Sequence, residues 1–220
     1  MLPIYLKDQD FSAPADAIYY LLTRDGLFLI KRTPFFEAAV PARGIPWLES
    51  QAFEVRLSAP PLPAALLLQA VAFFQAVFAR YRSEAVVLLA WKEASRSYEL
   101  VVPHQTVVGG HCDYEAREFP PVLIRLGTIH SHAGVEAFHS ERDWQDERFE
   151  DGFHLTVGNL DGDLTLSCSV VIQGFRGDIP PERLISPYPV AWDQGPPISD
   201  WIGEVDRKVT PLPRPIEFGT

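Results

Sequence analysis

The sequence has few cysteines and few basic residues for its length of 220 residues. Its two cysteines, Cys112 and Cys168, are too few for a disulfide framework and fit a reducing compartment. Its 19 Lys and Arg are outnumbered by 29 Asp and Glu, which gives a net charge of −10. This balance argues against nucleic-acid binding, because that function needs a basic surface to release phosphate counterions. We therefore expect a cytoplasmic protein that binds no nucleic acid.

One long uncharged run interrupts an otherwise ordinary globular composition of 47% hydrophobic and 22% charged residues. From Pro61 to Ala79 no charged residue occurs over 19 positions, which is close to the length of a membrane span. Gln69 and Gln75 interrupt the run, and strand-like sequence resumes too soon for a loop across a membrane. We interpret the run as a buried helix over 62–81 and expect no membrane association; a membrane span is the alternative.

The remaining pattern predicts an α+β fold, in which a mixed, mostly antiparallel sheet is flanked by helices. Asp25-Gly26 is typical of a two-residue hairpin turn, here within residues 18–31. A looser apolar segment over 53–57 is a possible strand. Further strands are predicted over 85–91, 98–103, 121–130, 153–158 and 164–172, and a short charged helix over 141–150.

Proline-rich segments divide the chain into three predicted parts. Residues 1–58 are expected to form a small β-rich module that ends at the sequence SAPP, residues 58–61. Residues 59–175 are expected to form the main domain. Residues 176–220, in which prolines are dense and periodicity fades, predict an irregular tail. Apolar residues of the first module would suit a homodimer or partner interface, and packing on the main domain is the alternative.

Four of the six histidines lie between residues 130 and 154. His130 and His132 are two apart at the end of a predicted strand, so their side chains should share a face. Ser140 and Asp143 follow. Two neutral imidazoles and one carboxylate can hold zinc and leave a fourth position open, as in catalytic zinc sites. The alternative is that Ser140 and Asp143 only cap a helix and that the histidines lie on a solvated face.

A hydrolase also needs a group that accepts a proton and passes it on. Glu84 lies between the predicted helix and an apolar strand, where partial desolvation would raise its pKa into a useful range. A solvated glutamate at a helix end is the alternative. Glu93 and Glu99 are poorer candidates, because they lie in or next to a polar hairpin loop.

Neighbouring residues receive structural interpretations. We expect His139 to be a surface histidine, with a contact to the site or its substrate as the alternative, and His154 to be a satisfied structural histidine. Cys112 beside a histidine has no visible orienting group and is not expected to be a nucleophile. Asp146 and Glu147 are expected on the solvated face of a short helix.

Taken together, Glu84, the run His130-Ser131-His132, Ser140 and Asp143 resemble the JAMM motif of MPN-type zinc isopeptidases. The likeness spans roughly residues 60–175. The phrases HSHAGVEAFHSERD and GLFLIKRTPFF are further similar to prokaryotic JAB proteins of the PRTRC system protein A group. The sequence departs from the common pattern at Ala133-Gly134, where many members have proline, and this predicts a more flexible loop.

The resemblance implies one zinc ion per chain, held by His130, His132 and Asp143. It also implies that Glu84 transfers protons and that Ser140 donates a hydrogen bond to the developing oxyanion. The implied activity is deubiquitinase-like: cleavage after the C-terminus of a ubiquitin-like protein, in deconjugation or precursor processing. Implied partners are that protein, its conjugates, and E1-like (ThiF-type) and E2-like proteins. A non-catalytic MPN scaffold for such partners is the alternative, and hydrolysis of a small amide or trimming of a sulfur-carrier protein is a third reading.

Overall fold

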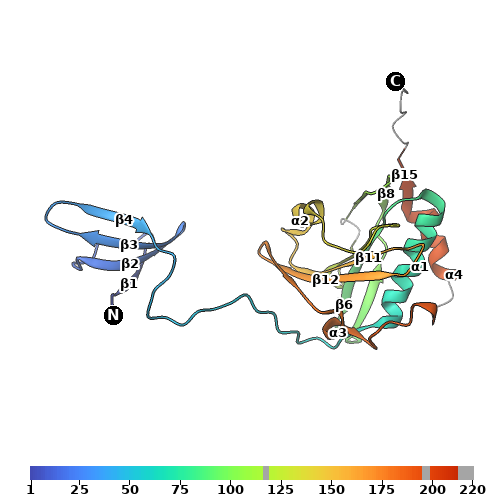
Figure 1. Ribbon diagram of the computed structural model, residues 1–220, viewed down its shortest axis with the longest axis horizontal. Coiled ribbons are helices and arrows are strands. Elements are labelled where there is room, and N and C mark those ends of the chain that lie inside the picture. Colours follow the sequence, from blue (N-terminus) through green and yellow to red (C-terminus); the bar gives the residue numbers. More distant parts are fainter. Residues whose placement is uncertain (116–118, 195–198, 213–220) are drawn as a thin grey trace, which may run out of the picture. The chain divides into compact units, whose positions relative to one another are not determined.

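The computed structural model describes residues 1–115, 119–194 and 199–212 (Figure 1). The chain divides into two compact units, Met1–Ala52 and Phe53–Thr220. The boundary falls before the predicted one at residue 58, because Val55 and Leu57 pack against the core of the second unit. The possible strand over 53–57 is absent, since these residues have no regular secondary structure.

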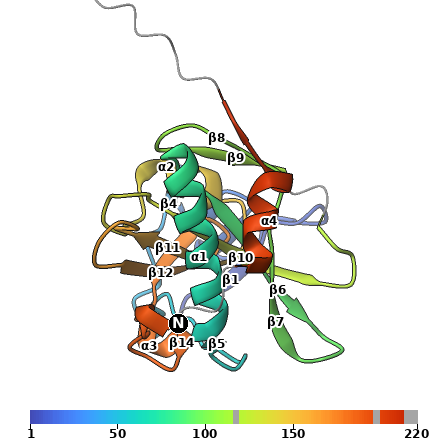
Figure 2. The same cartoon turned by 90° about the vertical axis from the view of Figure 1, so that its right-hand side faces the viewer.

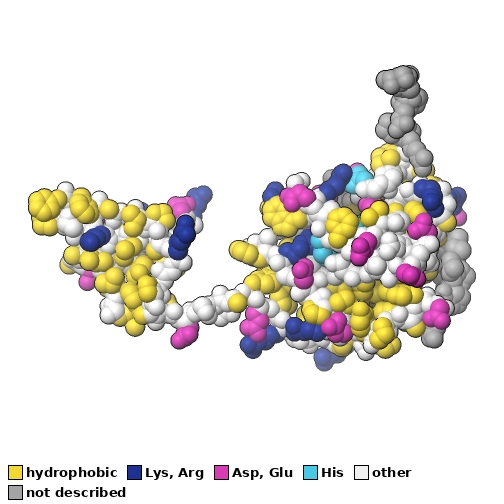
Figure 3. All heavy atoms as spheres, viewed as in Figure 1, with side chains coloured by type: hydrophobic (Ala, Val, Ile, Leu, Met, Phe, Trp, Pro, Cys, Tyr) yellow, Lys and Arg dark blue, Asp and Glu magenta, His cyan; other side chains and the backbone are white. Residues whose placement is uncertain are grey.

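The first unit is a four-stranded sheet with the order β1-β2-β3-β4. Strand β1 pairs in parallel with β2, and the other pairs are antiparallel. Tyr19, Leu21 and Ile30 form a small core. Hydrophobic side chains also cover much of the face of this unit that Figure 3 shows. Its role as an interface stays a prediction. The strands are Ile4–Leu6 (β1), Ile18–Thr23 (β2), Gly26–Arg32 (β3) and Glu37–Pro41 (β4).

The hairpin of β2 and β3 is confirmed, but its predicted turn was wrong by one residue. Thr23 pairs with Gly26, so Arg24 and Asp25 make the turn. The Thr23 hydroxyl donates to the Gly26 carbonyl at 3.0 Å and accepts from the Asp25 amide at 3.1 Å. Gly26, with φ of +119°, is therefore used as the first strand residue, in a conformation that favours glycine.

The second unit is built on a six-stranded sheet with the order β13-β12-β11-β10-β6-β7. Strands β10 and β11 are parallel, and the remaining neighbours are antiparallel. The predicted α+β class is thereby confirmed. The six strands are Val86–Lys92 (β6), Ser97–Val101 (β7), Ile124–Ser131 (β10), Gly152–Gly158 (β11), Thr165–Ile172 (β12) and Phe175–Asp178 (β13).

Shorter elements complete the second unit. Strand β5 (Leu62–Pro63) pairs with β14 (Ile185–Ser186), and a three-stranded sheet has the order β15-β8-β9. Its strands are Gln105–Val107 (β8), Cys112–Tyr114 (β9) and Val209–Pro211 (β15). The helices are Ala64–Tyr81 (α1), Glu141–Glu147 (α2), Pro181–Leu184 (α3) and Ser199–Lys208 (α4), with a 3₁₀ turn at Trp192–Gln194.

Helix α1 is the core helix that the uncharged run predicted. Its residues Leu67, Phe73 and Val77 are completely buried. The helix packs against β10, β7 and α4 (Figure 2). By length and composition the helix could also cross a membrane, and 56% of it is buried within the structure. This burial in the core of the unit is what the preferred interpretation expected.

The prediction of an irregular tail was wrong for most of its length. Between residues 175 and 211 the chain forms β13, α3, β14, α4 and β15. Helix α4 packs on α1: Val205 is buried, and the Trp201 ring lies edge-to-face on Phe73 with centroids 6.0 Å apart. Trp201 and Val205 are four residues apart and therefore share a helix face, a short signal that the prolines on either side obscured. Residues 195–198 and 213–220 of the predicted tail lie outside the described residues.

Candidate metal centre

The two paired histidines lie where β10 ends, in the middle of the six-stranded sheet. His130 is 9% exposed and His132 is 5% exposed, because β6 and β11 flank this strand. Their side chains share a face, as the period of two predicts, and their Nε2 atoms lie 3.3 Å apart. The hydroxyl of Ser131, between them, accepts a hydrogen bond from the backbone amide of Ala85 at 3.0 Å.

Asp143 reaches the histidines from the first turn of α2. Ser140 is the N-cap of this helix, and its Oγ accepts from the Asp143 amide at 3.1 Å. In return, the Ser140 amide donates to Asp143 Oδ2 at 2.6 Å. The capping-box alternative is therefore correct as a description of the helix start. It does not exclude the site, because the cap holds Asp143 beside the imidazoles.

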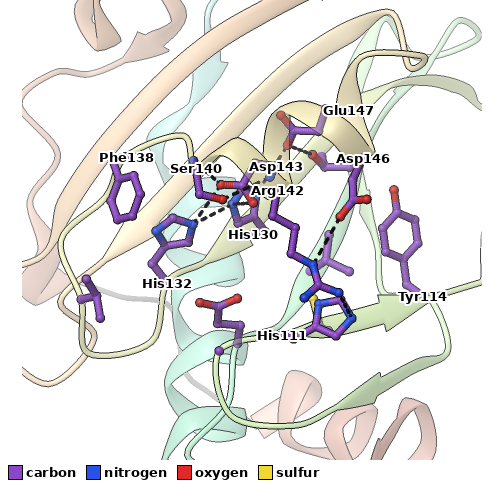
Figure 4. Close-up of a pocket in the computed structure, with 16 residues that line it drawn as sticks. His111, Tyr114, His130, His132, Phe138, Ser140, Arg142, Asp143, Asp146 and Glu147 are labelled. Carbon is purple, nitrogen blue, oxygen red and sulfur yellow. Dashed lines mark hydrogen bonds and ion pairs between the residues drawn. The ribbon is translucent and has the colours of Figure 1, made fainter.

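The ligand atoms of His130, His132 and Asp143 all lie within 4.8 Å of one another (Figure 4). Asp143 Oδ1 lies 3.5 Å from His130 Nε2, and Asp143 Oδ2 lies 3.3 Å from His132 Nε2. In a tetrahedral site with metal–ligand bonds of about 2.0–2.2 Å, neighbouring ligand atoms lie about 3.3–3.6 Å apart. The donor set and its spacing thus fit a metal ion.

The protonation states of His130 and Asp143 suit metal binding. Burial is the main cause that lowers the pKa of His130, which favours the neutral imidazole that a metal ligand needs. Burial opposes the charge of Asp143, but hydrogen bonds from His132 and Ser140 and the charge of His130 lower its pKa overall. For His132, burial lowers the pKa and the hydrogen bond and charge of Asp143 raise it, with a net increase. A metal ion would displace the proton that His132 donates to Asp143.

Glu84 opens into the same cavity, which has a volume of about 290 Å³. Burial raises its pKa to about 7, with smaller contributions from the charges of His132 and Asp143. The competing glutamates are engaged elsewhere: Glu93 accepts from the Trp91 indole at 2.8 Å, and Glu99 pairs with a lysine. Glu84 lines this cavity and Glu93 and Glu99 do not; the role of Glu84 in proton transfer stays a prediction.

Figure 4 shows the further walls of this cavity. Phe138 lies beside His132, with ring centroids 4.8 Å apart. At another wall, Arg142 contacts His111 Nε2 at 2.9 Å. Cys112 also lines the cavity, and burial raises its thiol pKa to about 12. That it is not a nucleophile stays a prediction.

Glu147 was predicted wrongly as a solvated residue. It is 6% exposed rather than solvated, and its Oε1 lies 3.7 Å from His130 Nδ1. Burial alone would raise its pKa, but the hydrogen bond from His154, the charges of His154 and His130, and a hydrogen bond from Arg176 lower it to about 2. The missed signal is spacing: Asp143 and Glu147 are four residues apart, so they share a face of α2.

The other two histidines between residues 130 and 154 were predicted with different success. His139 is half-buried rather than a surface residue, and its Nδ1 lies 3.3 Å from Thr156 Oγ1, which is itself 3.3 Å from His130 Nε2. Burial lowers the His139 pKa to about 4. His154 is completely buried and hydrogen-bonded at both ring nitrogens, as expected of a structural histidine.

The loop after the ligands is tied to the end of β11. Ala133 and Val135 accept backbone hydrogen bonds from Leu160 at 2.9 Å and Asn159 at 2.8 Å. The Ala137 amide donates to the Thr165 hydroxyl at 2.8 Å. Greater flexibility of this loop, expected from the missing proline, stays a prediction.

No protein-family model matches the chain, and no curated protein matches it. Among solved structures it is similar to a JAB1/MPN domain protein from Archaeoglobus fulgidus, with 17% identity over 56% of this chain and 94% of the other, and a TM-score of 0.37. It is also similar to a structure described as "JAMM: a metalloprotease-like zinc site in the proteasome and signalosome", with 18% identity over 56% and 96% of the two chains and a TM-score of 0.36. At these TM-scores, functional assignment has to rest on the geometry of the site itself. The closer likeness to PRTRC system protein A stays a prediction.

Proposed function

We propose that this chain is a zinc-dependent peptidase or isopeptidase of the JAMM type, which cleaves after the C-terminus of a ubiquitin-like protein. One observation carries the proposal: a cluster of two histidines and one carboxylate lines the same cavity as the half-buried Glu84. Zinc is the preferred metal, one ion per chain, because three such ligands leave a fourth tetrahedral position for a reacting molecule. A purely structural zinc site would use a fourth protein ligand instead.

The roles of the side chains follow from their positions. His130, His132 and Asp143 would hold the metal, which when bound supplies Lewis acidity that polarises a carbonyl group and acidifies water. With a pKa of about 7, Glu84 can accept a proton near neutral pH and deliver it to the departing amine. Ser140 would donate a hydrogen bond to the developing oxyanion; loss of one such donor costs about 10²–10³ in rate.

The mouth of the cavity supports a macromolecular substrate. Val135 is 59% exposed and Phe138 is 49% exposed, and both line the cavity. An extended C-terminal segment could therefore lie across exposed apolar side chains on its way to the metal position. Ubiquitin-like proteins, their conjugates, and E1-like and E2-like proteins remain the proposed partners, and the cytoplasm remains the proposed location.

Zinc content and cleavage should be measured on matched variants. The substrate is a ubiquitin-like protein with a C-terminal extension, and the comparison is a short peptide that carries the same scissile sequence. We expect about one zinc per wild-type chain and none in the double variant His130→Ala/His132→Ala. Glu84→Gln should keep its zinc and lose cleavage by about 10²–10⁴-fold, whereas Glu99→Gln, a charge-matched control, should cleave normally.

Each other outcome has a distinct meaning. A Glu84→Gln variant that cleaves at the wild-type rate would refute the role of Glu84. Equal cleavage of the short peptide would instead favour a hydrolase that does not recognise a ubiquitin-like module. A wild-type chain that binds no zinc and cleaves neither substrate would refute the enzyme and leave the scaffold function.

A further inference from the structure

A buried carboxylate lies behind the first metal ligand. The Nε2 of His130 faces His132 and Asp143, whereas its Nδ1 faces Glu147 Oε1 at 3.7 Å. Glu147 is almost completely buried, at 6% exposure, although it comes from the same short helix as Asp143. Two carboxylates of one helix, Asp143 and Glu147, therefore lie near the two nitrogens of the same imidazole ring.

The Glu147 carboxylate is itself held in place by other strands. Its Oε1 lies 3.2 Å from Nδ1 of His154 on β11. Its Oε2 accepts a hydrogen bond from Arg176 on β13, and Arg176 donates a second one to Ser169 on β12 at 2.6 Å. Three neighbouring strands of the sheet thus position one carboxylate. Breaking such a buried pair is costly, so the arrangement should be rigid.

The position of this carboxylate bears on the tautomer of His130. A neutral imidazole carries its proton on one nitrogen and a lone pair on the other, and the partner of one nitrogen decides the state of the other. A carboxylate near Nδ1 favours the proton there and leaves the Nε2 lone pair for a metal. With the proton on Nε2, the ring would instead donate to Asp143 Oδ1, now 3.5 Å away, and block the metal position.

We propose that Glu147, anchored by Arg176 and His154, is a positioning residue that holds His130 with its proton on Nδ1 and its Nε2 lone pair directed at the metal. The inference rests on the proposed function, because it concerns how the metal ligands are prepared. Partners of this kind typically contribute 10–100-fold to metal affinity.

The test compares Glu147→Gln with Glu141→Gln. Both remove one negative charge from α2, but Glu141 is exposed and lies in its first turn. Zinc affinity is measured by competition with a chromogenic chelator, and ¹⁵N NMR of the zinc-free proteins reports the tautomer of His130. We expect Glu147→Gln to bind zinc about 10–100-fold more weakly than wild type and to move the His130 proton toward Nε2. Glu141→Gln should match wild type in both measurements.

Two results would overturn the inference: a folded Glu147→Gln variant with the zinc affinity of Glu141→Gln, or a wild-type His130 that is protonated on Nε2 without metal. If Glu147→Gln does not fold, Arg176→Lys takes its place; it keeps the charge but loses the paired contacts, and it should weaken zinc binding in the same direction. If wild type binds no zinc, the proposed function fails, whereas the tautomer measurement still decides this inference.

Discussion

Acid should remove most of the stability that Glu147 contributes to the zinc-free protein. Its pKa falls from the ordinary value of 4.5 to about 2 in the folded chain, where burial is outweighed by His154, His130 and Arg176. A carboxylate whose folded-state pKa is lowered stabilises the fold fully above its unfolded pKa. That contribution is then lost as the pH falls from about 4.5 toward 2. The difference between these pKa values corresponds to about 3 kcal/mol of unfolding free energy.

The measurement is urea-induced unfolding of wild type and Glu147→Gln in chelator, at several pH values from 7 down to 2.5. Glutamine resembles the protonated acid, so the variant should be about 3 kcal/mol less stable at pH 7. The gap should shrink steadily below pH 4.5. Contributions from Asp143 largely cancel, because both proteins contain it.

The control is Glu141→Gln, whose difference from wild type should stay small at every pH, since Glu141 is exposed. A gap between wild type and Glu147→Gln that stays constant with pH would refute this reasoning. It would mean that Glu147 contributes through packing rather than through its charge.

Three further predictions concern other parts of the second unit. Burial raises the pKa of the Cys168 thiol to about 12, so iodoacetamide at pH 8 should alkylate this residue in the folded protein at least about 100-fold more slowly than in the urea-unfolded chain; equal rates would contradict the burial. Gly127→Ala should lower the unfolding free energy by more than about 2 kcal/mol, because its φ is +141° and an added Cβ would lie 1.8 Å from a β11 carbonyl oxygen. Gly162→Ala, in the same unit, would meet no atom within 4 Å and is the control in urea unfolding. Ala133→Gly should raise the midpoint of thermal unfolding, with a gain of up to about 1 kcal/mol, because Ala133 has φ of +50°; a lower midpoint would show that this conformation is not strained.

Much of the local structure could be predicted because its signals are short-range. The period of two places His130 and His132 on one face of a strand, and the cap that begins α2 sets Asp143 in its first turn. An apolar run long enough for a helix could hardly avoid burial in this chain, and α1 is buried. The hairpin turn was predicted one residue too late, because Gly26 can be either a turn residue or the first residue of a strand. The hydrogen bonds of Thr23 favour the second arrangement.

The sequence by itself determined which residue types could hold a metal and which glutamate could serve them, since these depend on side-chain chemistry and spacing along single elements. Only the tertiary structure decided the surroundings of the ligands. Glu147 is buried because Arg176 and His154 arrive from strands β13 and β11, which lie on either side of β12 and are brought together only by the folded sheet order. Helix α4 likewise gains its stability from packing on α1 rather than from its own composition. Burial and charge pairing between distant segments depend on long-range packing, which no local pattern encodes.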